Sequence, residues 1–229
     1  MASTLMPEAD AIRLHVMAPD LTVPGFRYLS GFIVLLQDSR HDGGRDVQTG
    51  EVINEERTGH WLSAVGYLIL LDQIGKCFKP KTVPKAAYRN SVEWCLSHWS
   101  PEITGDDSAA IYALRNALLH DYSLFNENRE KPEYQHLFSL DRMTGQGVVR
   151  LPRTRWNGDF ADTAGACRTL VSLTELGNLT ESIVAAVREA GPWGIDVLLA
   201  GGSDELLQRY GLLIPDPTVT GPPFSTHAV

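Results

Sequence analysis

Hydrophobic residues recur three or four positions apart over most of this chain, the spacing that places side chains on one face of an α-helix. The spacing is clearest around Phe32 and Leu36, and again between Trp61 and Ile74. Glycine- and proline-containing segments such as 41–50 and 79–85 separate the helical stretches. The predicted helices cover about 24–40, 51–78, 85–98, a segment that starts near 104–108 and carries 112–124, then 160–190, 193–200 and 203–211.

The period changes over 136–156, where short β-favourable segments flank a glycine-containing turn, a pattern typical of a β-hairpin. We therefore expect a mainly α fold, a helical bundle with a β-hairpin inserted near 136–156. Residues 1–214 should form a single domain. The segment 215–229, rich in Pro, Thr and Gly, should be a flexible tail.

Length and composition are those of an ordinary globular protein, with 229 residues of which 43% are hydrophobic. The longest apolar runs, at 32–36 and 67–71, are far shorter than the ~20 residues of a membrane span. Residues 1–15 lack the basic and apolar segments of a signal peptide. Three scattered cysteines indicate neither a disulfide framework nor a cysteine-rich zinc site. These features together favour a reduced, cytoplasmic protein that does not enter a membrane.

The formal net charge of −8 argues against a protein that coats nucleic acid through a large basic surface. Two local segments, 76–89 and 142–155, nevertheless contain several basic residues and no acidic ones. Each is either solvated loop charge or a rim that holds phosphates near one active site. The candidate RNA contacts are Lys76, Lys79, Lys81, Lys85, Arg150, Arg153 and Arg155.

The segment YALRNALLHDYSL (112–124) combines core material with groups that suit metal-free cleavage of RNA. A histidine such as His120 can take a proton from a 2′-hydroxyl or give one to the leaving 5′-oxygen. Arg115 offers a charged fork of donors that stabilises negative charge on phosphorus. Asn116 can orient the histidine or bind phosphate, and Tyr122 offers a hydroxyl or a ring for base stacking.

Helical geometry permits these side chains to border one cleft but does not require it. Asn116 and His120 are four residues apart and therefore neighbours, whereas Arg115 and His120 lie about 140° apart on an ideal α-helix. Only the reach of the arginine, or a distortion near His120, brings the two together. The alternative is a solvated polar face. Because one histidine does not easily serve as both acid and base, a two-fold homodimer would supply a second set of groups.

The run Arg115-Asn116-Ala117-Leu118-Leu119-His120 resembles the signature of the HEPN superfamily, an arginine, a polar residue and then a histidine. With Asp121 and Tyr122 it also resembles the His-x-Tyr extension of HEPN toxins that are paired with nucleotidyltransferase antitoxins. The resemblance implies a helical bundle, metal-independent endoribonuclease activity, a homodimer with its site at the interface, and a role in toxin–antitoxin or antiviral defence systems. It also implies catalytic roles for Arg115 and His120, and Tyr122 as a position where a partner enzyme attaches adenylate.

No other pattern in the chain predicts a complete site. Cys95 and His98 have no matching ligands elsewhere in the sequence and are more typical of a packed helix edge. We therefore expect neither a metal site nor a cofactor. The alternative to an RNA-cleaving enzyme is a non-catalytic HEPN module that dimerises or binds RNA or nucleotide.

Overall fold

The computed structural model describes residues 6–17, 22–23, 26–84, 90–103, 105–161 and 165–215. About 54% of the described chain is helical and 17% is strand. Within it the α-helices are α1 (Glu8–Val16), α2 (Gly31–Asp42), α3 (Trp61–Cys77), α4 (Ser91–Trp99), α5 (Gly105–Asn116), α6 (Leu173–Gly194) and α7 (Gly202–Tyr210). The strands are β1 (Thr22–Val23), β2 (Phe26–Ser30), β3 (Phe78–Pro80), β4 (Phe125–Asn126), β5 (His136–Asp141), β6 (Val149–Arg150), β7 (Arg168–Ser172), β8 (Ile195–Val197) and β9 (Gly211–Pro215).

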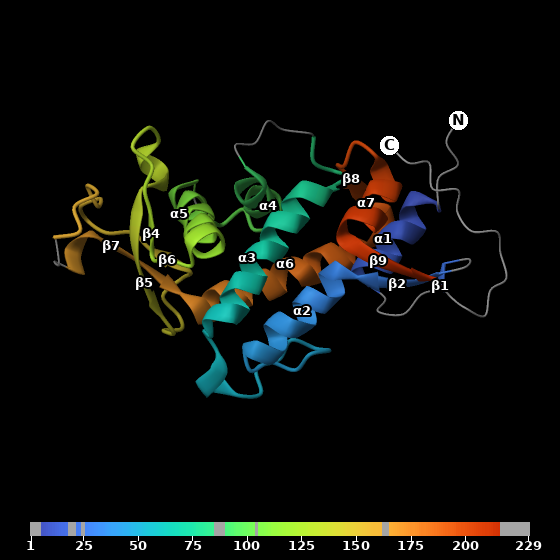
Figure 1. The fold of residues 1–229 in the computed structure, drawn as a ribbon, viewed down its shortest axis with the longest axis horizontal. Helices are drawn as coiled ribbons and strands as arrows, with labels where there is room; N and C mark the ends of the chain where they lie inside the picture. The colour runs from blue at the N-terminus through green and yellow to red at the C-terminus, as the bar shows by residue number, and fades with distance from the viewer. Residues whose placement is uncertain are drawn as a thin grey trace.

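The fold is α/β, and the expected mainly α bundle is wrong. The strands form a four-stranded sheet, a three-stranded sheet and a two-stranded pair. The four-stranded and three-stranded sheets lie at opposite ends of the molecule, with the helices between them (Figure 1). The prediction failed because much of the pairing joins segments far apart in the chain, which hydrophobic spacing does not record.

The four-stranded sheet has the order β4-β5-β7-β6 and is mixed. Strands β5 and β7 run parallel, from Leu137 opposite Arg168 to Asp141 opposite Ser172. Strand β6 pairs antiparallel with β7, and β4 pairs antiparallel with β5. The β-hairpin predicted over 136–156 is therefore absent: both of its strands exist, but β7 lies between them. Residues 168–172, predicted as helix, provide that central strand.

The three-stranded sheet joins the two ends of the described chain. Strand β2 pairs antiparallel with β9 from Phe26 opposite Pro215 to Ser30 opposite Gly211. The helix predicted over 24–40 therefore begins only at Gly31, where the Ser30 side chain caps α2 by accepting a hydrogen bond from the Ile33 N–H. The helix predicted over 193–200 is also wrong, because Ile195–Val197 forms β8 and pairs with β3.

Helix α3 is the centre of the hydrophobic core. It packs against α2, α4, α5 and α6 (Figure 1). Leu68, Leu70, Leu71 and Ile74 are all fully buried, and a helix that is apolar on nearly every side belongs in an interior. Asp72 is an exception, a carboxylate within this apolar run.

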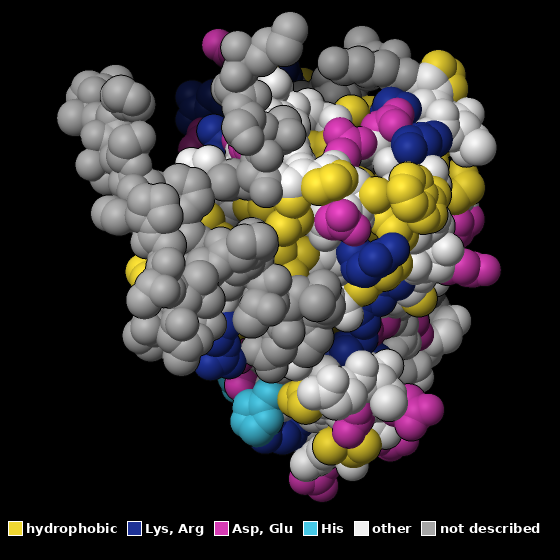
Figure 2. Space-filling view, turned by 90° about the vertical axis from the view of Figure 1, so that its right-hand side faces the viewer, with side chains coloured by type: hydrophobic (Ala, Val, Ile, Leu, Met, Phe, Trp, Pro, Cys, Tyr) yellow, Lys and Arg dark blue, Asp and Glu magenta, His cyan; other side chains and the backbone are white. Residues whose placement is uncertain are grey.

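On the face at the β2–β9 end, hydrophobic, acidic and basic side chains lie intermixed, and neither sign of charge dominates the part that is described (Figure 2). Leu29, Leu212 and Ile214 are the exposed aliphatic residues of β2 and β9. Across the described ranges, no helix combines the length and apolar character needed to cross a membrane.

Candidate functional site

The motif segment folds as a helix that changes its winding within the motif. Helix α5 ends at Asn116, and Ala117–Asp121 continues as a π-helical turn. The N–H of Tyr122 donates to the Ala117 carbonyl, a bond across five residues. Turns of this kind are rare and occur often at functional sites.

The π-turn brings Arg115 and His120 closer in angle than a regular helix would. Each π-helical residue turns by roughly 80–90° instead of about 100°, so over the three π-helical steps before His120 the separation of about 140° falls to roughly 80–110°. Ile111, Leu114 and Leu118 are buried on the apolar face of the segment. The π-turn is thus a helix distortion near His120, one of the two ways in which Arg115 and His120 can come together.

Arg115 is held by a polar cluster that connects three helices. Its Nη2 lies 3.2 Å from Oδ2 of Asp72 on α3, and its Nη1 donates to Oδ1 of Asn116 at 3.1 Å. Asp72 also pairs with Lys76 at 2.5 Å and accepts a hydrogen bond from the Ser91 hydroxyl on α4. The arginine is therefore fixed in place, with its side chain 19% exposed.

The electrostatics of the cluster favour a charged Asp72. Burial alone would raise its pKa, but the hydrogen bonds from Lys76 and Ser91 and the positive charge of Arg115 outweigh burial and lower it. The Nε–H of Arg115 is buried and has no acceptor within the described chain. Orphan donors of this kind are uncommon in folded proteins.

His120 and Tyr122 lie on the accessible side of the segment. His120 is exposed and forms no hydrogen bond to any described residue. Tyr122 is 54% exposed and has φ 49° and ψ 41°, the only non-glycine residue with positive φ in the described chain. Because this left-handed conformation ends the helix, the side chain of Tyr122 does not lie two helical turns above Arg115, as it would on a continued helix. Its ring instead lies 5.5 Å from that of Trp61, at an angle of 58°.

The basic candidates do not form one rim. Lys76 reaches the Arg115 cluster through Asp72, whereas Lys79 forms an ion pair with Asp196 on β8. Lys81 is exposed in the turn after β3, and Lys85 lies outside the described residues.

The arginines of the second basic segment lie on or next to the four-stranded sheet. Arg150 is exposed on β6 and donates to Gln146. Arg153 and Arg155 line a separate cavity of about 210 Å³ beside the buried His136. Arg155 lies 3.9 Å from Asp106 across it. Of the six basic candidates that the structure describes, only Lys76 thus contacts the group that holds Arg115.

Sequence reasoning missed Asp72, Ser91 and the aromatic partner Trp61. The signal for Asp72 is its place in YLILLDQIGK (67–76), where a single carboxylate interrupts a buried stretch. Carboxylates are almost never fully buried unless they are paired. Nothing in the sequence indicates that Ser91 or Trp61 faces the motif, because both come from other helices.

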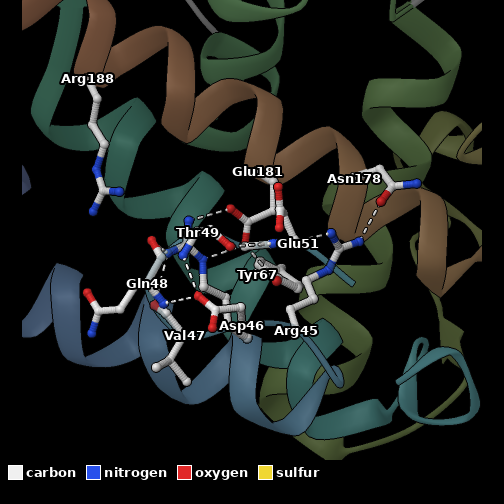
Figure 3. A network of polar contacts seen from close by, with 12 residues as sticks. Arg45, Asp46, Val47, Gln48, Thr49, Glu51, Tyr67, Asn178, Glu181 and Arg188 are labelled. Atoms are coloured by element: carbon white, nitrogen blue, oxygen red, sulfur yellow. Dashed lines mark hydrogen bonds and ion pairs between the residues drawn. The ribbon is translucent and has the colours of Figure 1, made fainter. Parts of the chain in front are cut away.

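A second polar cluster connects the 43–54 loop with α2 and α6 (Figure 3). Arg40 and Glu181 form a bidentate pair at 2.9 and 2.7 Å, and the Tyr67 hydroxyl donates to the same carboxylate. Arg40 also donates to the carbonyls of Val47 and Gln48, and Arg45 donates to the carbonyl of Gly50. These bonds hold the 43–54 loop against α6. The guanidinium donors of Arg40 and Arg45 are therefore used within the protein, and the cluster is not a candidate ligand site.

Two further groups considered from the sequence are packed elements. Cys95 is completely buried, and burial raises the pKa of its thiol. His98 stacks on Trp94 with ring centroids 4.2 Å apart. In the part of the chain that the structure describes, no three His, Cys, Asp or Glu side chains gather closely enough to hold a metal ion. No protein-family model, curated protein or solved structure matches this chain.

Proposed function

We propose that this protein is a metal-independent endoribonuclease that uses Arg115 and His120 as the HEPN ribonucleases do. The observation that supports the proposal is the π-turn at Ala117–Asp121, which lies within the motif, between a fixed, partly buried arginine and an exposed histidine. The proposal concerns the site alone, since the architecture around it is α/β.

The chemistry assigned to each group follows from its placement. A base removes the proton of the ribose 2′-hydroxyl, the 2′-oxygen attacks phosphorus, and an acid protonates the departing 5′-oxygen. His120 serves as the base or the acid, and Arg115 stabilises the negative charge that builds on the phosphoryl oxygens. The products are a 2′,3′-cyclic phosphate and a 5′-hydroxyl. Asn116 and Asp72 position the guanidinium, and Lys76 adds positive charge beside it.

The partners are part of the same proposal. A homodimer would place a second His120 opposite the first and provide both proton-transfer groups. Tyr122 presents a hydroxyl with no hydrogen bond to a described residue, which suits adenylate attachment by an antitoxin or other defence-system partner. Native mass measurement tests the dimer, and incubation with ATP and a nucleotidyltransferase partner tests the modification.

The central experiment is RNA cleavage in the presence of EDTA. Wild type should cleave single-stranded RNA and leave cyclic phosphate ends, whereas His120→Ala should not. His41→Ala is the matched control, because His41 is another exposed histidine, near the end of α2. Cleavage that stops on chelation, or that His120→Ala performs as fast as wild type, would contradict the mechanism.

One observation favours a second candidate, a non-catalytic module that binds RNA or nucleotide. Arg115 already pairs with Asp72 and Asn116 within the protomer, as expected for a purely structural ion pair. In that case RNA should bind without any product forming. Binding to uncleaved RNA, followed together with product analysis, separates the two functions.

A further inference from the structure

A pocket of about 460 Å³ opens directly beside the motif. Four separate parts of the chain build it: Tyr122, the start of α3 with His60 and Trp61, the end of β5 with Asp141 and Arg142, and Leu173 at the start of α6. Its volume is within the range of pockets that hold small ligands. The four-stranded sheet thus contributes to a site next to the motif.

The pocket presents aromatic surface to solvent. Tyr122 is 54% exposed, and the angle of 58° between its ring and that of Trp61 makes two walls instead of one stacked pair. The backbone of Tyr122 is left-handed, which costs energy for a residue with a side chain. A strained residue that holds a ring out to water is a reason to look for a ligand.

Polar groups at the edge of the pocket suit a nucleotide. His60 and Arg142 are both exposed. Arg142 is fixed through Nη1, which donates to the Glu56 carbonyl at 2.7 Å, so its other guanidinium donors remain for a phosphate. Asp141 uses one carboxylate oxygen to accept from the Met143 N–H, and the other oxygen can accept from a base.

We propose that this pocket binds an unpaired base of single-stranded RNA, which stacks on Tyr122 and Trp61 while Arg142 contacts the adjoining phosphate. The inference rests on the proposed function for its choice of ligand. His120 does not line the pocket, but two residues span at most about 7 Å, so a nucleotide held at Tyr122 would lie beside the motif segment. The pocket would then select flexible, unpaired RNA, because a base within a duplex cannot expose its faces.

The test measures binding without cleavage. The probe is a short fluorescein-labelled single strand of 2′-O-methyl RNA, which lacks the attacking hydroxyl, and its affinity is read by fluorescence anisotropy. Tyr122→Ala should weaken binding about tenfold, the order of effect of removing one stacking ring. Tyr122→Phe keeps the ring and should bind like wild type.

The matched control is Trp193→Ala. Trp193 is a 73% exposed aromatic residue near the C-terminal end of α6, whereas Leu173 at the other end of α6 lines the pocket. The helix runs without interruption from Leu173 to the kink at Gly191, on the order of 25 Å, and Trp193 lies beyond the kink, so this control should bind the probe normally. Melting temperatures verify that each variant is folded.

Three results would overturn the inference. Wild type fails to bind the probe, Tyr122→Ala binds the probe as tightly as wild type, or Tyr122→Ala weakens binding of a duplex of the same sequence as much as binding of the single strand. None of them depends on catalysis. If His120→Ala abolishes cleavage while Tyr122→Ala binds the probe normally, the nuclease stands and the base pocket fails. If wild type never cleaves but Tyr122 governs binding of the single strand, the pocket stands and the nuclease fails.

Discussion

The guanidinium of Arg115 and the carboxylate of Asp72 lie 3.2 Å apart and connect the motif helix to the central helix of the core. Lys76 and Ser91 complete the shell around the carboxylate. The position of the arginine is therefore set by residues 24 to 43 positions earlier in the chain. Four predictions follow from this cluster and from the other buried polar groups.

The fork shape of Arg115 should matter more than its charge. In Arg115→Lys the ammonium cannot reach both Asp72 and Asn116 while it presents further donors to a phosphate. We expect the cleavage rate in EDTA to fall about 100-fold or more, comparable to the loss of one transition-state donor, with only a small change in melting temperature. Arg115→Ala should be at least as inactive. A lysine variant that cleaves as fast as wild type would mean that the guanidinium does not act on the phosphate.

Replacing Asp72 should produce a pH-dependent loss of stability. The folded-state pKa of Asp72 is lowered, so its contribution is complete above the unfolded pKa and is lost as the pH falls through the folded pKa. Asp72→Asn should therefore cost about 1–3 kcal/mol in free energy of unfolding at pH 7. The difference from wild type should stay constant down to about pH 4.5 and shrink below about pH 4. Urea unfolding over this range measures it, and a difference that widens in acid would contradict the assignment.

His15 should make the protein sensitive to mild acid. It is fully buried, its Nδ1 lies 2.7 Å from the Tyr28 hydroxyl and its Nε2 lies 3.0 Å from Nε2 of Gln73. Burial lowers the pKa of His15 to about 3, so the unfolded chain binds the extra proton first. Stability is then complete above about pH 6.5 and falls as the pH drops toward 3, by about 2 kcal/mol at pH 5.

The measurement for His15 compares wild type with His15→Gln, which cannot titrate. The variant should be less stable at pH 7 but should lose less stability between pH 7 and pH 5. Parallel curves for the two proteins would show that other groups cause the acid sensitivity.

The buried pair between Arg40 and Glu181 should be essential for stability. Glu181→Gln keeps the shape of the side chain but leaves Arg40 in the interior without a carboxylate, which should cost about 3–5 kcal/mol. Asp46→Asn is the control, because Asp46 is at the surface of the same loop and caps it through the N–H groups of Gln48 and Thr49. That change should cost much less than Glu181→Gln, because the amide oxygen of the introduced asparagine can still accept from the same N–H groups. Denaturant unfolding compares the two, and equal losses would contradict the prediction.

Sequence pattern located the helices of the core better than the strands. Within the described chain, α3, α4, α5 and α7 lie inside or close to their predicted ranges, because their apolar spacing reflects their own burial. Strand β2 was predicted as helix, since Phe26, Leu29 and Phe32 also fit a helical period. Its pairing with β9, far away in the chain, decides the outcome. The sequence pattern does not predict the pairing of β5 with β7 either, because strands that follow each other in the chain are expected to pair as a hairpin.

In the candidate site too, local features could be predicted from the sequence and tertiary contacts could not. Arg115, Asn116, His120 and Tyr122 are contiguous, so one stretch of sequence was enough to select them. The π-turn that reorients His120 was not predictable from a 3.6-residue period, and Asp72 and Arg142 reach the region only through tertiary packing. Local sequence therefore selected the candidate groups, and the folded chain determines how they are held.

The pairing of β2 with β9 also has a consequence during synthesis. A ribosome completes residue 30 long before it reaches residue 211, and at ordinary translation speeds the interval is roughly 10–40 s. During that time the hydrogen-bonding edge of β2 has no β9 to cover it, and open edges of this kind invite aggregation. Pairing of β2 with β9 therefore has to wait until residues 211–215 emerge, and a variant that slows translation of the C-terminal half should increase aggregation.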